Sequence, residues 1–392
     1  MVVKRYFYIQ QLTFSLCGID LKATNSKHVV TRPLLCYVPL CFAICHVVAI
    51  VHYAFVNRHD YVEVTDSLAL FCQSLLAIWK MLIFLYKRQG FIEMIHELQL
   101  GNSKAGRLEL PMIRSENTRD VTFSTIYFTV VLTSVFFAFG SPIIEAVYFY
   151  VSTEELVLRM PHKASYFWNH TQLPGYSVVY MWDMLSIYNL VGISLAIDTL
   201  FTWLVSNISA QFHILCFRFK DTAKAFDDGT NDSLKFMKSI KSCISYHNQT
   251  LKLADKLNEV YGEIIFIKFI ISCSQICCLV FRLSRPIESL TAAAYQGFFL
   301  ASVAIQLILY CYNGQRIRDE SLQVATEIYY AFDWSHLPKS CKKLLLIPMM
   351  RSQKASELKG VFFVVDLTLY LWVFKTAGSL IAALKTLEEN RI

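Results

Sequence analysis

The side chains with the clearest chemical potential are five ionisable groups that stand inside long apolar runs: Lys80, Asp198, Lys268, Asp366 and Lys375. Ionisable groups at membrane depth are costly, and they often line polar routes or pair with one another. Lys80 and Lys268 stand toward one end of their runs, where we expect the ammonium groups to reach the interface with water. Lys375 is the fifteenth residue of a 24-residue run. We therefore expect Lys375 to face a water-filled cavity or an internal polar partner.

Enzymatic signatures are absent from the sequence. It contains no GxGxxG, GxxxxGK[ST], GxSxG or HExxH motif, so no phosphate-binding loop, nucleophile or zinc-protease site is indicated. His46 and His52 share one apolar run, but a spacing of six residues places them poorly on one helical face. Most of the twelve cysteines stand in apolar runs, and we interpret them as small buried hydrophobes. The sequence therefore predicts no enzyme, no metal site and no cofactor.

The elements that must position these groups are predicted from the apolar runs. Of the 392 residues, 55% are hydrophobic and 17% are charged, a composition that excludes a disordered chain and is unusual for a soluble one. A membrane-spanning helix needs about 20 mostly apolar residues. The fold class predicted is an all-α membrane protein in which residues 1–392 form a single domain of seven transmembrane helices. These spans are predicted at 33–56, 67–86, 121–144, 184–206, 264–281, 290–312 and 361–384.

The orientation follows from the basic residues between the spans. With a cytoplasmic N-terminus, the inner segments carry 27 Lys and Arg and the outer segments carry 7. The positive-inside rule therefore predicts a cytoplasmic N-terminus and, with seven spans, an extracellular C-terminus. We assign the net charge of +7 to these loops and expect no nucleic acid as a partner. Asn169 belongs to a glycosylation sequon in the outer segment 145–183 and is the candidate site for that modification.

Three inner segments have helical patterns. Segment 207–263 has apolar residues at helical spacing, which predicts a long helix continuous with the following span. Segment 313–360 predicts a helix over 319–332, a turn around 335–338 and a second helix over 339–351. We expect these extensions to be cytoplasmic anchor helices that pack beneath the membrane. Segment 5–19 mixes aromatic and polar residues, which predicts a helix in the membrane interface.

An ordered set of motifs occupies about the last 80 residues. These are CYNGQ from Cys311, ES at Glu320, YYAFDW from Tyr329, RSQK from Arg351 and KTAGS from Lys375. In this order and spacing they resemble the insect odorant receptor family, although Gly378 stands where many members have Tyr. The remaining chain is similar to that family in its number of spans, loop lengths and orientation.

The resemblance implies a ligand-gated cation channel of the plasma membrane. In that family, four subunits surround a pore lined by the seventh span, and a tuning subunit assembles with the odorant receptor co-receptor. Segment 207–263 lacks the large insertion of the co-receptor, so this chain resembles a tuning subunit. Alignment from Phe362 places Ala383, Thr386 and Leu387 at pore-facing positions near the outer mouth, although packing against neighbouring helices is an alternative.

The expected ligand is a small volatile odorant, bound in an apolar, aromatic cavity in the outer half of the spans. Tyr295 is the main candidate, because its hydroxyl could donate to a ligand carbonyl while its ring supplies dispersion. Membrane lipid is the other expected non-protein partner. The candidate lining residues are Phe71, Ser74, Leu75, Phe136, Phe137, Gly140, Ile187, Val191, Tyr295, Phe298 and Phe299.

Other receptor and transporter classes remain as alternatives. A gustatory receptor would share the fold, but its usual Thr-Tyr and Gln-Phe pattern is missing around Thr368 and Phe374. A G-protein-coupled receptor has the opposite orientation, so the loop charges oppose that assignment. A transporter is opposed by the absence of an internal repeat.

Overall fold

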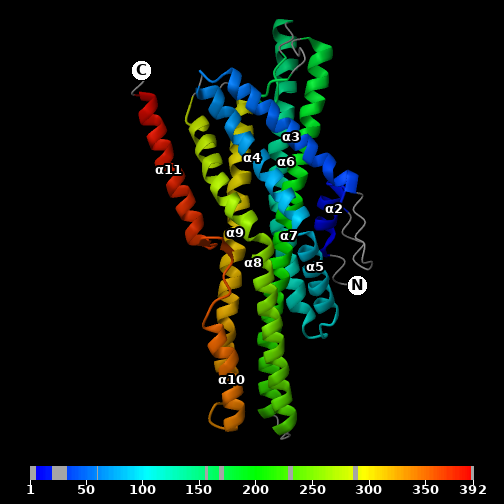
Figure 1. Cartoon of the computed structure of the whole chain (residues 1–392), viewed down its shortest axis with the longest axis vertical. Coiled ribbons are helices and arrows are strands. Elements are labelled where there is room, and N and C mark those ends of the chain that lie inside the picture. The colour runs from blue at the N-terminus through cyan, green and yellow to red at the C-terminus, as the bar shows by residue number, and fades with distance from the viewer. Residues whose placement is uncertain are drawn as a thin grey trace.

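The computed structural model describes residues 6–19, 33–59, 61–154, 158–166, 172–227, 233–285 and 290–389. Nearly all of its elements are helices, arranged as an elongated bundle (Figure 1). They are α2 (Tyr8–Leu16), α3 (Pro33–Val56), α4 (Tyr61–Tyr86), α5 (Arg88–Ser103), α6 (Leu110–Thr153), α7 (Leu173–Asp227), α8 (Ser233–Leu283), α9 (Leu290–Ala331), α10 (Lys339–Ser352) and α11 (Leu367–Glu389), with two short strands, β1 (Lys359–Gly360) and β2 (Phe363–Val364).

Six of the described helices are long and apolar enough to cross a membrane, namely α3, α4, α6, α7, α8 and α9. This confirms the prediction of an all-α, multi-pass membrane protein. The seventh predicted span corresponds to α11, whose apolar part, Leu367–Ala383, is shorter. Four of the long helices, α6, α7, α8 and α9, extend well beyond the apolar segments predicted for them. They extend because polar residues at helical spacing continue the same helix outside the apolar part.

The predicted seventh span begins too early at 361. Residues Lys359 and Gly360 pair antiparallel with Val364 and Phe363 in a two-stranded hairpin, and α11 begins only at Leu367. Val361 in the turn has a φ of 55°, which lies in the left-handed region and cannot continue a right-handed helix. Hydropathy did not show this boundary, because the hairpin residues are as apolar as those of the helix.

Helix α7 forms the centre of the bundle. It contacts α2, α3, α4, α6, α8 and α9, and Leu200, Phe201, Trp203 and Leu204 on it are fully buried. Consecutive buried residues on one helix mean that every face is covered, as expected for a helix that is apolar all round. The other helices therefore reach the same core from different sides.

Helix α2 packs one of its sides into this core. The ring of Phe7 lies 4.5 Å from that of Trp203, and the ring of Phe14 lies 5.1 Å from that of Phe84. Tyr8 and Leu12 on the other side of α2 are about half exposed. Part of the apolar residues of this helix thus contact the core, and its position in the membrane interface stays a prediction.

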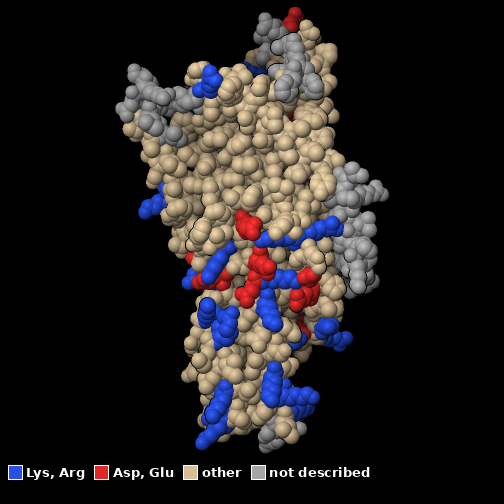
Figure 2. All heavy atoms as spheres, in the orientation of Figure 1, with Lys and Arg blue, Asp and Glu red and all other residues tan. Residues whose placement is uncertain are grey.

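The charged side chains are unevenly distributed. Figure 2 shows few of them on the upper part of this face, whereas Lys and Arg side chains are numerous on the lower part and acidic groups form a band near the middle. Ion pairs join the helices of the polar part, such as Lys256 to Glu93 at 3.0 Å and Lys220 to Glu327 at 2.6 Å. The uncharged upper surface has the composition expected of a lipid-facing one.

Asp333 holds the predicted turn between α9 and α10. Its Oδ1 accepts from the backbone N–H of Ser335 at 2.9 Å and from its hydroxyl at 2.6 Å, and Oδ2 lies 2.6 Å from His336 Nδ1. The hydrogen bonds from Ser335, followed by that from His336, hold the pKa of Asp333 well below its usual value. Helix α9 ends at Ala331 and α10 begins at Lys339, in agreement with the predicted helix, turn and helix.

Candidate ligand-binding site

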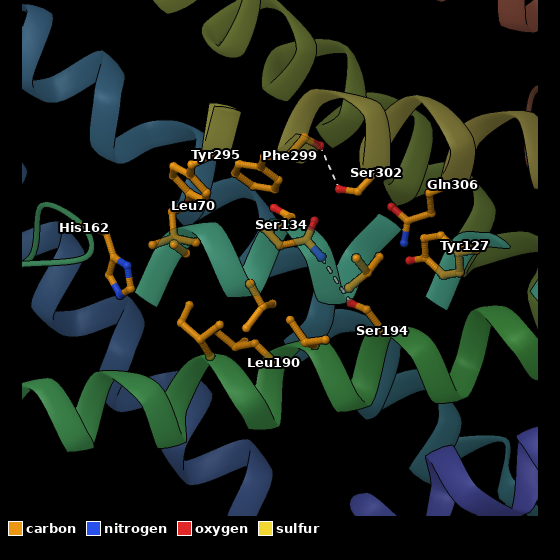
Figure 3. A pocket seen from close by; sticks show the side chains of 16 residues that line it. Leu70, Tyr127, Ser134, His162, Leu190, Ser194, Tyr295, Phe299, Ser302 and Gln306 are labelled. Carbon is orange, nitrogen blue, oxygen red and sulfur yellow. Dashed lines mark hydrogen bonds between the residues drawn. The ribbon is translucent and has the colours of Figure 1, made fainter. Parts of the chain in front are cut away.

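A cavity of about 60 Å³ lies among α4, α6, α7 and α9 (Figure 3). Its wall combines apolar and aromatic side chains with several uncharged polar ones, a character that suits a small organic molecule. The lining residues are Leu70, Gln73, Tyr127, Val131, Ser134, Val135, Ala138, His162, Ile187, Leu190, Val191, Ser194, Tyr295, Phe299, Ser302 and Gln306.

Two aromatic rings from successive turns of α9 form part of the wall. Tyr295 and Phe299 stack with their centroids 5.9 Å apart and their planes inclined by 20°. The Tyr295 hydroxyl makes no hydrogen bond to another residue in the part of the chain that the structure describes. Ser194 and Ser302 add hydroxyl groups, and the Ser194 oxygen accepts from Gln73 Nε2 at 3.2 Å. The cavity can therefore offer dispersion contacts and a few hydrogen bonds to a small, mainly apolar molecule.

One end of the cavity meets a buried polar cluster around Asp198. Tyr127 and Gln306 lie together at this end in Figure 3, and both donate to the Asp198 carboxylate, Tyr127 at 2.9 Å. Lys80 Nζ donates to the same carboxylate at 2.6 Å, and the Tyr310 hydroxyl donates at 2.7 Å. The carboxylate thus has charged and neutral donors that compensate for its loss of water.

The lysines of this cluster correct a prediction. Lys80 and Lys268 are both fully buried, and neither ammonium group reaches the interface. Lys268 donates to the Gln306 side-chain oxygen, and Gln306 in turn donates to Asp198. Burial is tolerated because each ammonium group has a polar partner. The negative charge of the Asp198 carboxylate also attracts both ammonium groups. We name Lys80, Tyr127, Asp198, Lys268, Gln306 and Tyr310 the Asp198 cluster.

The other end of the cavity adjoins a second, wider cavity of about 190 Å³. His162 lies at this end in Figure 3, and it lines both cavities together with Leu70, Tyr295 and Phe299. The wall of the wider cavity also includes five charged side chains, Asp66, Glu145, Arg159, Lys163 and Arg282. The two cavities thus share four wall residues, and the wider one has the more charged wall.

Four of the eleven candidate ligand residues line the smaller cavity, namely Ile187, Val191, Tyr295 and Phe299. The other candidates do not line it. Phe136 is 65% exposed and Leu75 is 41% exposed, Gly140 adjoins Phe136, and Phe137 stacks on Phe298 at 5.3 Å. Phe71 is half-buried against the core, and the Ser74 hydroxyl donates to the Leu70 carbonyl at 2.9 Å.

On α4 and α6 the residues that line this cavity differ from the candidates by a rotation of about one helical face, and ligand binding by the candidates stays a prediction. Leu70 and Gln73 line the cavity where Phe71 and Ser74 were expected, and Ser134, Val135 and Ala138 replace the candidates on α6. Hydrophobicity cannot fix this rotation in a membrane protein, because a lipid-facing surface is as apolar as a cavity wall. The sequence did flag Asp198, but it could not show which residues of other helices surround it.

The remaining candidate residues lie elsewhere. Ala383 and Thr386 are exposed on α11, and the Thr386 hydroxyl donates to the Ala382 carbonyl at 3.0 Å. Leu387 belongs to the same helix, but its side chain lies outside the described part. Asn169 also lies outside the described residues. The pore and glycosylation assignments therefore stay predictions.

Comparisons with known proteins agree on one family. Residues 60–378 match the sequence profile of the family described as 7tm Odorant receptor. The chain is 29% identical to Odorant receptor 45a of Drosophila melanogaster over 390 residues, which cover 98% of this chain and 99% of that protein. It is 28% identical to Odorant receptor 82a of the same species, over 98% of this chain and 100% of that protein.

The fold is similar to that of a solved receptor. The insect olfactory receptor OR5 from Machilis hrabei, solved in complex with eugenol, matches with a TM-score of 0.83 at 14% identity, over 98% of this chain and 97% of that one. The same receptor solved without mention of a ligand matches with a TM-score of 0.77. At this identity the match carries information about the fold alone.

Proposed function

Since this chain belongs to the insect odorant receptor family, a family of receptors and not of enzymes, we propose that it is a ligand-tuning subunit of an odorant-gated cation channel. A small volatile molecule binds in the cavity between α4, α6, α7 and α9, and its binding favours the open state of the channel. The observation that carries the proposal is that cavity, in which apolar and aromatic side chains stand beside the Tyr295 hydroxyl and a few other polar groups. The eugenol bound by the Machilis hrabei receptor supports a ligand of similar size and polarity.

The proposal includes the assembly of the channel. The chain forms a heterotetramer with the odorant receptor co-receptor in the plasma membrane, its N-terminus is cytoplasmic, and α11 lines the pore near its extracellular C-terminus. The distribution of basic residues supports this orientation. Exposed apolar side chains on α11, including Leu371 and Trp372, support contacts of this helix with lipid or with other subunits.

Electrophysiology tests the function directly. Cells that express this chain with the co-receptor should give cation currents in response to some members of a panel of volatile molecules. Cells with the co-receptor alone should not respond to those molecules. A response without any ion current through the complex, transmitted instead by a G protein, would contradict the proposal.

Tyr295→Phe should weaken the response selectively. The change removes one hydroxyl and keeps the ring that stacks on Phe299, so ligands with a hydrogen-bond acceptor should lose about 1 kcal/mol, roughly fivefold in half-maximal concentration. Hydrocarbon ligands should be affected little. The measurement is a pair of dose–response series, with Tyr148→Phe on the exposed side of α6 as the matched control. Equal losses for both ligand classes would show that Tyr295 acts on folding or gating and not on binding.

Thr386→Lys should reduce cation current or cation selectivity in complexes with the co-receptor. Thr386 is exposed on α11, and a fixed positive charge in the pore raises the barrier for cations. Reversal potentials and unit conductance measure the effect, and Thr386→Ser serves as the control without a charge. Unchanged permeation with a shifted odorant sensitivity would remove this residue from the pore.

A further inference from the structure

Three side chains from distant parts of the chain meet beside the smaller cavity. His46 comes from α3, His162 from the segment 158–166 and Asp183 from α7. His46 and Asp183 are fully buried, and the His162 side chain is 7% exposed. One ligand atom from each lies within 4.8 Å of the other two. We name these three residues the histidine cluster.

The distances suit coordination better than direct hydrogen bonding. His162 Nε2 lies 3.3 Å from Asp183 Oδ2, and His46 Nδ1 lies 3.8 Å from Asp183 Oδ1. Ligand atoms about 2.1 Å from a tetrahedral zinc ion stand about 3.4 Å from one another. The pairs are thus separated as neighbouring ligands around one ion would be, within a few tenths of an ångström.

The polar atoms of this cluster lack other partners. Among the described residues, both nitrogens of His46, Nε2 of His162 and both oxygens of Asp183 are buried without a hydrogen-bond partner. No lysine or arginine in the described part of the chain pairs with Asp183. Leaving a buried carboxylate and buried imidazoles unsatisfied is costly, about 1–3 kcal/mol for each group and more for a charged one. One cation at the centre would satisfy all three residues together.

A comparable group elsewhere shows what a compensated cluster looks like. Glu116, His213 and Glu320 also lie within reach of a common point. There, however, the Arg316 guanidinium contacts both carboxylates, with its Nε 2.9 Å from Glu320 Oε1. The positive charge that this group needs is therefore supplied by an arginine side chain. No such side chain is present among the described neighbours of Asp183.

We propose that the histidine cluster binds a divalent transition-metal ion, with Zn²⁺ as the ion that suits it. Two imidazoles and one carboxylate are typical zinc ligands, whereas calcium and magnesium require mainly oxygen ligands. Three protein ligands leave a fourth position for water. No sequence motif indicates the site, because the three residues stand far apart in the chain.

A metal ion in the histidine cluster would also hold part of the wall of the ligand cavity in place. His162 lines both cavities, and the segment that carries it is tied to α3 by one backbone hydrogen bond, from Ser165 N–H to the Ala49 carbonyl at 3.1 Å. A metal ion would join that segment to α3 and α7 at a second point. An effect on odorant sensitivity rests on the proposed function, whereas metal binding itself does not.

Cobalt titration tests the metal site without any odorant or current. Full-length protein is purified in detergent, stripped with EDTA and titrated with Co²⁺, whose visible absorption is intense in four-coordinate sites. We expect one Co²⁺ per chain with that absorption and its displacement by Zn²⁺. His162→Ala and Asp183→Asn should each weaken binding at least tenfold, since even the loss of a residue that supports a metal ligand costs that much.

His52→Ala is the matched control, because His52 is exposed on α3, the same helix as His46. It should bind as the unmodified protein does. Zn²⁺ should raise the unfolding temperature of the unmodified protein and of His52→Ala, and it should raise that of the two cluster variants much less. If Asp183→Asn does not fold, His162→Ala carries the test, since its residue lies outside the helices. Absence of four-coordinate Co²⁺ in the unmodified protein, or equal affinity in His162→Ala, would overturn the proposal.

Discussion

Asp198→Asn should destabilise the protein by about 3–5 kcal/mol, the usual cost of removing one partner from a buried ion pair. The substitution keeps the size of the side chain and an acceptor oxygen, so it tests the charge. Lys80, whose ammonium group lies 2.6 Å from the Asp198 carboxylate, would lose its counter-charge, and so would the nearby Lys268. The measurement is the free energy of unfolding of the purified protein in detergent, together with its level at the cell surface.

Two further variants separate charge from packing. Tyr261→Phe removes a hydroxyl that donates to the Ile197 carbonyl at 3.0 Å in the same core, and it should cost only about 1 kcal/mol. Adding Lys80→Met to Asp198→Asn removes one of the unpaired ammonium groups, so the double variant should recover part of the lost stability. If Asp198→Asn were as stable as Tyr261→Phe, the Asp198 cluster would not depend on the charge of its carboxylate.

Gly314→Ala should disrupt the junction of α9 with the hairpin that precedes α11. A Cβ at this position would collide with the carbonyl oxygen of Val365 and approach the Val365 Cβ to 3.3 Å. The backbone there cannot withdraw freely, because Val365 N–H donates to the Leu358 carbonyl at 2.8 Å. We expect a loss of about 3 kcal/mol or more, at the upper end of the range for overpacking, and a loss of odorant-evoked current.

Gly297→Ala is the matched control for this variant. Gly297 stands on the same helix, and a Cβ there would meet nothing within 4 Å. Because alanine is the better helix former by about 0.5–1 kcal/mol, Gly297→Ala should be neutral or stabilising. The free energies of unfolding of both variants are measured in parallel. Gly314→Ala reports the collision of the new Cβ with Val365, whereas Gly297→Ala reports helix propensity alone. Similar stabilities for the two variants would show that the chain relaxes around position 314.

The features predicted best from the sequence are those that depend on amino-acid composition and on the spacing of apolar residues. Runs of apolar residues located the long helices, and the turn after α9 followed from the residues around 335–338, although the role of Asp333 in it was not predicted. The start of α11 was wrong because a tight hairpin of apolar residues has the same hydropathy as a helix. The position of Gly314 in a motif was visible, but its reason, the approach of Val365, depends on a contact between distant segments.

The candidate site was harder to predict, for a physical reason. Which face of α4 or α6 lines the cavity depends on helix rotation, and lipid gives no contrast with an apolar wall. The direct partners of the Asp198 carboxylate come from three other helices, and the two residues that meet His162 come from α3 and α7. The meeting of these residues depends on how the helices pack against one another. No local pattern in a single sequence shows that packing.

One structural feature bears on how the protein can change over evolutionary time. The Asp198 carboxylate, directly or through Gln306, holds side chains of α4, α6, α8 and α9 on α7, whereas much of the cavity wall beside it consists of separate apolar side chains. Exchanging one such side chain, Val191 for instance, for another of similar size costs little stability, about 1.5 kcal/mol or less. The same freedom does not extend to the carboxylate. Ligand preference can therefore diverge by single substitutions in the wall that leave the anchoring of five helices to one another in place.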